Sequence, residues 1–158
     1  PTDQYDRTVP ANVDVREVAA VEDLRTLYSV AEEAFGHAPD VDERDLEREL
    51  GDCTGEHRRV ARFLAYRNGE PAGAAGMTFF EGLSFILLWG AGVRPAHRGH
   101  GVYTSLLATR AEFGRERDLD LMGLYARKGT SAPIVAAHGF ERHGHMTHFE
   151  RSLRSRGG

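Results

Sequence analysis

The sequence predicts a mixed α/β (α+β) fold with a central, mostly antiparallel mixed sheet of about seven strands and about four helices. Three observations predict it. The middle third has strand-like segments joined at Asn68-Gly69, a strong hairpin signal. A helical spacing of three and four apolar positions precedes this stretch and returns after it. After residue 85, a strand, a helix and a strand follow in succession, which is the pattern of a parallel crossover.

The length and composition of the chain exclude several classes of protein. The 158 residues fit one domain, which we place at 13–154, with a tail or linker at 1–12 and a short tail at 155–158. A formal charge of −4 gives no basic field for nucleic acid. No apolar run approaches about 18 residues, so no membrane span is expected. The single cysteine, Cys53, excludes an internal disulfide and suits a reducing compartment, so we expect a cytoplasmic protein.

The first elements are a strand and two helices. Residues 13–16 alternate between apolar and polar side chains, as a short strand does. A helix is predicted to begin near Glu22 and to end before Gly36. Residues 40–52 hold seven acidic side chains around a thin apolar stripe, which predicts an exposed second helix. Such a run is usually a solvated face, and the alternative is that it attracts a cationic substrate.

Strands and turns alternate through the middle of the chain. Strands are predicted over 60–67, 72–80 and 85–93, with turns at Asn68-Gly69 and Glu81-Gly82. A type I′ turn needs positive φ at both central residues, and Asn-Gly provides it. These three strands are expected to form an antiparallel meander.

The last third returns to alternating elements. A helix is predicted over 101–117 and a strand over 119–126. Thr130 or Ser131 then starts another helix, which Gly139 ends. A final pair of strands is predicted over 140–143 and 145–153.

The segment between the strand at 85–93 and the helix that follows carries the chemistry. Pro95 cannot continue a central strand, so pairing must stop there. Gly99 and Gly101 allow a ligand to approach the backbone closely. The free N–H groups of the first helical turn form an anion site, strengthened by the helix dipole. Arg98 adds a fixed positive charge that suits phosphate oxygens, so a diphosphate is the expected ligand.

Other interpretations of this segment were weighed. A Gly-x-Gly pair alone also fits an ordinary helix start, since such starts often carry glycine. The lysine of a P-loop is missing, and the dinucleotide fingerprint needs a third small residue in a first-strand setting.

The segment resembles the pyrophosphate loop of the GNAT superfamily of N-acetyltransferases, whose pattern is Arg/Gln-x-x-Gly-x-Gly/Ala. Arg98, Gly101 and Tyr103 fall on its three specified places, and Tyr103 departs from the small residue usual at the last. The preceding Val-x-Pro and the late helix at 132–140, which ends in Gly-Phe, are also similar to the family. The resemblance covers about residues 13–153, and the order of the elements is that of a GNAT-like fold.

The resemblance implies a bound acetyl-CoA and no metal. In the family, the pantetheine pairs with the strand before the loop, at the positions of Ala91, Gly92 and Val93, and an N–H near Val93 stabilises charge on the thioester oxygen. The positions that would hold the diphosphate are Arg98, Gly99, His100, Gly101, Val102, Tyr103 and Thr104. We therefore expect Gly101→Glu to abolish CoA binding. The expected partners are acetyl-CoA and an amine acceptor of undetermined identity, and a homodimer is left open.

The two usual catalytic side chains of the family are absent by position. Leu87 to Gly92 offers no acid, and Val135 stands where many members have a tyrosine. Tyr125 is proposed as the acid for the departing thiolate and Glu33 as the base for the amine. Their alternatives are a buried strand tyrosine and a solvated helix residue. His143, His145 and His148 lack a carboxylate or cysteine nearby in sequence, so they are interpreted as surface residues and not as a metal site.

Three functions remain open from the sequence. The first is an active N-acetyltransferase that moves an acetyl group from acetyl-CoA to a primary amine. The second is a non-catalytic acyl-CoA-binding module, such as half of a two-domain protein. The third is a GNAT-like fold that has lost CoA.

Overall fold

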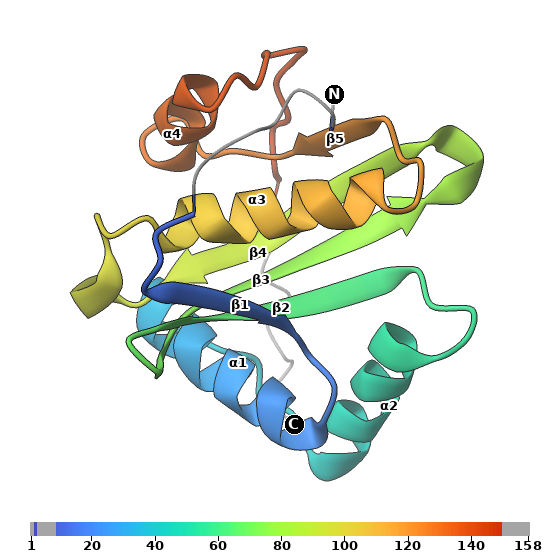
Figure 1. Ribbon diagram of the computed structural model, residues 1–158, viewed down its shortest axis with the longest axis vertical. Helices are drawn as coiled ribbons and strands as arrows, with labels where there is room; N and C mark the ends of the chain where they lie inside the picture. The colour runs from blue at the N-terminus through green and yellow to red at the C-terminus, as the bar shows by residue number, and fades with distance from the viewer. Residues whose placement is uncertain (1, 3–8, 150–158) are drawn as a thin grey trace, which may run out of the picture. The chain divides into compact units, whose positions relative to one another are not determined.

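A computed structural model describes residue 2 and residues 9–149 of the chain (Figure 1). The strands and helices follow the predicted order closely. They are β1 (Val13–Glu17), α1 (Val21–Phe35), α2 (Glu43–Thr54), β2 (Val60–Arg67), β3 (Glu70–Phe80), β4 (Phe85–Val93), α3 (Val102–Arg115), β5 (Leu121–Leu124) and α4 (Ser131–Ala137). Two short 3₁₀ helices, η1 (Glu81–Leu83) and η2 (Pro95–His97), flank β4.

One sheet orders the strands as β1-β2-β3-β4-β5. The first three pairings are antiparallel, as expected for the meander. The fourth pairing, between β4 and β5, is parallel, and α3 makes the crossover between them. The parallel ladder runs only from Phe85 opposite Leu121 to Leu88 opposite Leu124. The second half of β4 therefore extends beyond β5.

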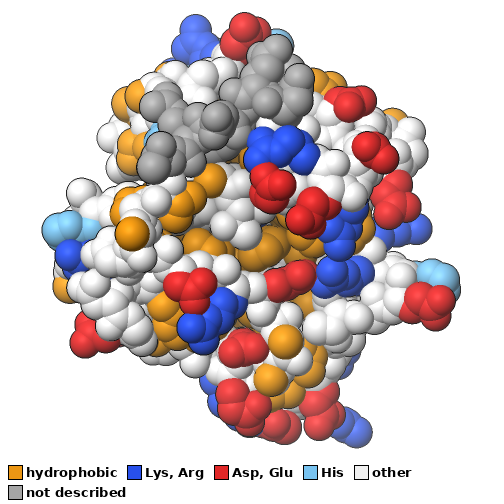
Figure 2. Space-filling view, viewed as in Figure 1, with side chains coloured by type: hydrophobic (Ala, Val, Ile, Leu, Met, Phe, Trp, Pro, Cys, Tyr) orange, Lys and Arg blue, Asp and Glu red, His pale blue; other side chains and the backbone are white. Residues whose placement is uncertain are grey.

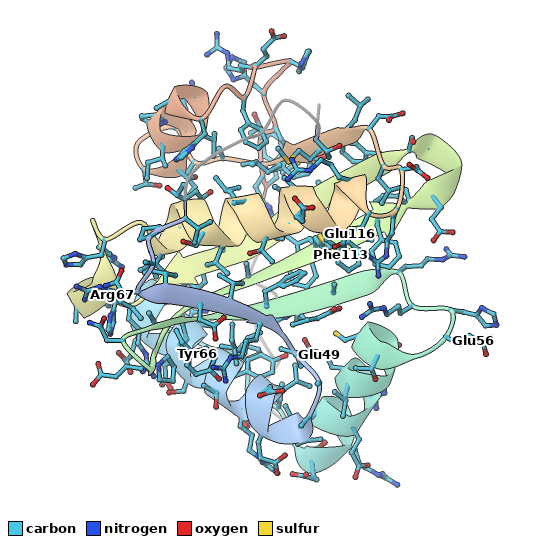
Figure 3. The ribbon with its side chains drawn as sticks, viewed as in Figure 1. Glu49, Glu56, Tyr66, Arg67, Phe113 and Glu116 are labelled. Atoms are coloured by element: carbon cyan, nitrogen blue, oxygen red, sulfur yellow. The ribbon has the colours of Figure 1, made fainter. Side chains whose placement is uncertain are left out.

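Helices cover both faces of the sheet, with α1 and α2 on one side and α3 on the other (Figure 1). On the first face, Leu64 and Ala74 belong to a core cluster with Leu24, Leu27 and Val30 of α1. On the other face, Phe113 of α3, labelled in Figure 3, packs its ring against strand side chains. Its ring centroid lies 6.1 Å from that of Phe63 and 5.4 Å from that of Phe79. Because side chains alternate along a strand, each helix layer buries its own apolar set.

The predicted turn chemistry is confirmed at two places. Asn68 and Gly69 both have positive φ, of 53° and 83°, as the type I′ hairpin requires. Gly36 ends α1 in the left-handed region, and its N–H donates to the Glu32 carbonyl. The second turn differs in form from the two-residue turn expected, because Glu81 begins a 3₁₀ helix that ends at Leu83.

The strand count corrects the expectation of about seven. The sheet has five strands among the described residues, and residues 140–149 contain none. The strand predicted over 140–143 is therefore wrong. The strand over 145–153 is absent as far as residue 149, and its end lies outside the described residues. The segment is rich in exposed polar side chains, including His143, His145 and His148, and its apolar Met146 and Phe149 are three residues apart, so they would fall on opposite faces of a strand.

The chain divides into two compact units between Leu124 and Tyr125. The first holds the sheet with α1, α2 and α3. The second begins at Tyr125 and holds α4, in which Val135 is buried and Ile134 is exposed. The single domain expected over 13–154 stays a prediction. No helix in the described part of the chain is long and apolar enough to cross a membrane.

A half-buried polar cluster joins α1, α2 and β2. Glu49 of α2, labelled in Figure 3, accepts a hydrogen bond from the Tyr28 hydroxyl and lies 3.1 Å from Nη1 of Arg62. Burial and the Glu49 carboxylate raise the pKa of Tyr28 to about 12. Burial likewise raises the pKa of the Cys53 thiol to about 11, so this thiol stays protonated at neutral pH. Tyr28 thus links α1 to α2 through Glu49, and Cys53 is a fully buried side chain of α2.

Candidate functional site

The end of β4 has an unpaired edge. Among the described residues, no strand of the sheet pairs with β4 on its β5 side beyond Leu88. The Arg94 N–H donates to the Ala72 carbonyl of β3. Successive peptide groups of a strand point to opposite edges, so the N–H of Val93 faces the free edge. A ligand lying there can pair with the backbone of β4, and the assignment of Ala91, Gly92 and Val93 to this pairing stays a prediction.

The strand leads into a compact loop with two left-handed glycines. Pro95 starts the 3₁₀ helix η2, so strand pairing stops there, as expected. Gly99 and Gly101 have φ of 75° and 78°, a region that other L-residues rarely adopt. A side-chain carbon at Gly99 would meet nothing within 4 Å, so this part of the loop faces open space.

Helix α3 starts without a side-chain cap. Gly101 is its N-cap residue, and no side chain in the described part of the chain caps it. The first backbone bond across this turn runs from the Ser105 N–H to the Gly101 carbonyl, at 2.9 Å. The N–H groups of Val102 and Tyr103 come before this first bond in the chain, so the helix itself offers them no carbonyl. This is the geometry of an anion site at a helix start, and it lies beside the exposed His100.

The Arg98 side chain makes two contacts that the sequence did not predict, and its expected role at the diphosphate stays a prediction. Its guanidinium donates to two backbone carbonyls, from Nε to Val93 at 3.2 Å and from Nη2 to Ala34 at 3.2 Å. Ala34 lies in the last turn of α1, where carbonyls lack helical partners. Arg98 thus fastens the loop both to the end of β4 and to α1. The positive charge of its guanidinium remains close in the chain to the start of α3.

Arg94 makes a second link between β4 and α1, and it holds Glu33. Its Nη2 lies 3.0 Å from the Ser29 hydroxyl and 3.1 Å from Oε1 of Glu33, and its Nη1 donates to the Pro71 carbonyl at 3.0 Å. Glu33 is about half exposed, so its carboxylate is open to solvent on one side. The structure therefore places the proposed base near the end of β4, in an ion pair that sequence reasoning missed.

The two tyrosines differ in setting. Tyr103, on the first turn of α3, is half-buried, and burial raises its pKa while the Arg110 charge acts in the opposite direction. Tyr125 directly follows β5 and begins the second compact unit, where it is 71% exposed. It is therefore not the buried strand tyrosine of the alternative interpretation. Its role as an acid stays a prediction.

Gly92 fixes the fit between β4 and α1. A side-chain carbon at Gly92 would lie 2.8 Å from Cβ of Ala34 and 2.8 Å from the Phe35 ring. We expect Gly92→Ala to lower the free energy of unfolding by about 1–3 kcal/mol, because α1 must shift to make room. Gly82→Ala is the matched control, since its new carbon would meet nothing within 4 Å. Urea denaturation measures the free energy of unfolding of both variants. Equal values for Gly92→Ala and Gly82→Ala would contradict this packing.

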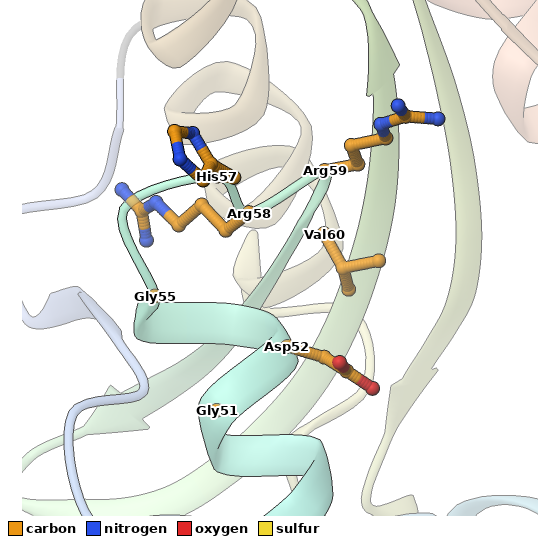
Figure 4. A pocket seen from close by; sticks show the side chains of 7 residues that line it. All are labelled: Gly51, Asp52, Gly55, His57, Arg58, Arg59 and Val60. Carbon is orange, nitrogen blue, oxygen red and sulfur yellow. The ribbon is translucent and has the colours of Figure 1, made fainter.

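An open pocket of about 400 Å³ lies elsewhere. This pocket lies at the start of β2, which pairs with the end of β3. The loop after β4 lies at the other end of β3, because Val93 pairs with Gly73. In Figure 4 the side chains of His57, Arg58 and Arg59 point in different directions and do not converge on one ligand. The lining residues are Gly51, Asp52, Gly55, His57, Arg58, Arg59 and Val60.

The charged side chains of one face and the possible metal ligands of the described residues form no further cluster. The face shown in Figure 2 carries acidic and basic side chains interspersed rather than in separate patches. Among residue 2 and residues 9–149, no group of three or more His, Cys, Asp or Glu side chains is placed to hold a metal ion.

Together, the crossover sheet, the free β4 edge and the start of α3 define a mixed α/β domain with a candidate anion site directly after β4. A comparison with protein families matches residues 21–144 to the Acetyltransferase (GNAT) family. The chain belongs to this family, whose members use acetyl-CoA. A comparison with curated protein sequences finds no match.

Solved structures share the fold at low sequence identity. An aminoglycoside acetyltransferase from an uncultured soil metagenomic sample, in complex with trehalose, has a TM-score of 0.75 and 14% identity over 90% of this chain and 97% of that one. Glucosamine-6-phosphate N-acetyltransferase from Arabidopsis thaliana has a TM-score of 0.73 and 9% identity over 89% and 99%. An aminoglycoside N-acetyltransferase in complex with CoA has a TM-score of 0.69 and 19% identity over 89% and 95%.

Proposed function

We propose that this chain is an N-acetyltransferase that moves an acetyl group from acetyl-CoA to a primary amine of a small molecule or peptide, by direct attack in a ternary complex. The observation that carries the proposal is at the end of β4. In the part of the chain that the structure describes, a free strand edge leads there through two left-handed glycines into a helix start without a side-chain cap. Family membership adds the expectation of acetyl-CoA chemistry.

The residues at this end of β4 suit the two parts of CoA. The free edge at Ala91, Gly92 and Val93 offers backbone groups to the amides of the pantetheine arm. The loop and helix start offer N–H groups and positive charge to the diphosphate. The residues assigned to the diphosphate are Arg98, Gly99, His100, Gly101, Val102, Tyr103 and Thr104.

Bound acetyl-CoA would supply the acetyl thioester. The Val93 N–H, directed to the free edge, would donate to the thioester oxygen and stabilise charge that develops there. Glu33 is the proposed base, because an amine with a pKa of about 10.4 must lose a proton before it can attack. Tyr125 is the proposed acid for the departing thiolate. In this proposal, a proton leaves Glu33 for solvent as its ion pair with Arg94 re-forms.

An amine acceptor also has support from the fold neighbours. Two of them are named as acetyltransferases of aminoglycosides, and one as an acetyltransferase of glucosamine-6-phosphate. In this chain, α2 carries acidic side chains that include Glu43 and Glu47, both exposed. A cationic acceptor would be attracted to this helix. The expected compartment remains the cytoplasm, since the single cysteine suits a reducing environment.

A second candidate is a non-catalytic acyl-CoA-binding module. The observation in its favour is that β4 carries no acidic side chain and that Val135 stands in α4 where a tyrosine is usual. Glu33, the replacement base, is held in an ion pair with Arg94. CoA binding alone is therefore consistent with both candidates.

A turnover assay separates the two. The protein is mixed with acetyl-CoA and a panel of amines that includes amino sugars, arylalkylamines and peptides, and free thiol is measured. We expect thiol release that depends on one class of amine. Tight CoA binding in calorimetry with no thiol release on any amine would instead establish the module.

A further inference from the structure

A β-bulge interrupts β4 just before the candidate site. Trp89 lies opposite Gly76 of β3, and Gly92 lies opposite Ala74. Two residues of β4, Gly90 and Ala91, therefore stand opposite the single residue between Ala74 and Gly76. Gly90 has a φ of 60°, as the left-handed residue of such a bulge requires.

The bulge changes what the end of β4 presents. Trp89 and Gly92 are three residues apart, so in a regular strand they would face opposite sides. Here both face α1 and α2, because each pairs with a β3 residue on that side. The bulge begins at Gly90, two residues after Leu88, the last residue paired with β5. The strand therefore bends where its edge becomes free, and this sets the direction of the peptide groups from Ala91 to Val93.

Trp89 holds the bulge from the α1 side. Its indole fills the space above Gly76, where a side-chain carbon would lie 2.5 Å from Cζ3 of the ring. Its Nε1 donates to the Thr78 hydroxyl at 3.0 Å. The Arg62 guanidinium lies 4.7 Å from the ring centroid, within the range of a cation–π contact. The ring is thus fixed on three sides.

Arg110 of α3 holds the opposite strand from the other face. Its side chain is only 1% exposed, and Nη1 donates to the Gly76 carbonyl at 3.2 Å while Nε donates to Leu106 at 2.8 Å. Burying a guanidinium is costly, and part of that cost is offset by these bonds. Gly76, beside the bulge, is therefore contacted by Trp89 on one face and by Arg110 on the other.

The geometry points to Trp89 and Arg110 as positioning residues, which keep the β4 bulge in the register that turns the Ala91–Val93 backbone toward the thioester. This inference rests on the proposed acetyltransferase function. It assigns to both side chains an effect on turnover, exerted through the backbone of β4 and without contact with CoA or amine.

The Trp89–Thr78 hydrogen bond gives the sharpest test. Thr78→Val removes the hydroxyl with little change of shape, and Trp89→Phe keeps a ring over Gly76 but loses the N–H. Each is expected to lower kcat by on the order of 10-fold, with a much smaller change in the CoA dissociation constant because the loop assigned to the diphosphate is untouched. Thr78→Ser keeps the hydroxyl and should keep kcat. The double variant should be no slower than either single one, since both remove the same bond.

Thr54→Val is the matched control. It removes a hydroxyl bonded to the Leu50 carbonyl on exposed α2, far along the chain from β4, and should leave kcat unchanged. Arg110→Met extends the test to the other face and should lower kcat in the same way. Wild-type kcat in Thr78→Val, Trp89→Phe and Arg110→Met would overturn the inference, even if their thermal stability falls.

NMR makes the test independent of turnover. The amide resonances of Gly90, Ala91 and Gly92 should shift in Thr78→Val and Trp89→Phe but not in Thr78→Ser. Unshifted amides in both variants would overturn the inference. If wild-type protein acetylates no amine, the acetyltransferase proposal fails, and these resonances, measured also in Arg110→Met, still decide whether Trp89 and Arg110 hold the bulge.

Discussion

Replacing Gly99 with Asp is expected to weaken CoA binding at least about 10-fold, whereas Gly99→Asn should bind within a small factor of wild type. Gly99 has a φ of 75° and open space around it. Asn and Asp both tolerate this left-handed conformation better than other residues. The two variants therefore differ mainly in one negative charge beside the proposed diphosphate.

Calorimetry with CoA at low and at high salt measures this difference. The gap between Asp and Asn should shrink as salt rises, because exposed charges are screened. Equal affinities at low salt would contradict a diphosphate at this loop. Gly101→Glu should abolish binding, as expected from the sequence. It is a less specific probe, because a side-chain carbon at Gly101 would also lie 2.5 Å from Cγ of Pro10.

Arg98→Lys is expected to weaken CoA binding several-fold, although it preserves the charge. The guanidinium reaches two carbonyls, those of Val93 and Ala34, from different nitrogens. A lysine is a single flexible donor and cannot reproduce this fork. The loop should therefore lose its link to α1 while retaining a cation beside the helix start.

Arg98→Met separates the two contributions of this side chain. It removes the charge as well as the hydrogen bonds, so CoA should bind more weakly to it than to Arg98→Lys. Wild-type affinity in Arg98→Lys with a large loss in Arg98→Met would show that only the charge matters. That result would contradict the positioning role that the structure assigns to Arg98.

Most of the fold was predictable because its signals are local. Asn68-Gly69 fixes a hairpin, and Gly36 ends a helix, through backbone angles that the residues themselves favour. The strands predicted over 140–143 and 145–153 had no such support. Around Gly144 the exposed residues are mostly polar, and Met146 and Phe149 do not alternate with period two, so residues 140–149 lack the regular apolar face of a strand.

The candidate site was only partly predictable, because its parts come from distant segments. Gly99 and Gly101 signal an anion site by their position before a helix, and their φ values of 75° and 78° agree with that interpretation. The contacts of Arg98 with Ala34 and of Arg94 with Glu33 depend on how α1 packs against β4. The extra residue of the β4 bulge depends on pairing with β3, which no short segment encodes.

The central claim is that CoA binds along the free edge of β4 with its diphosphate at the start of α3. A crystal structure of the protein with CoA at saturating concentration tests it most directly. We expect the diphosphate oxygens to accept hydrogen bonds from backbone N–H groups between Gly99 and Thr104, and the pantetheine arm to pair with Ala91–Val93. CoA bound elsewhere, or no bound CoA at that concentration, would contradict the claim.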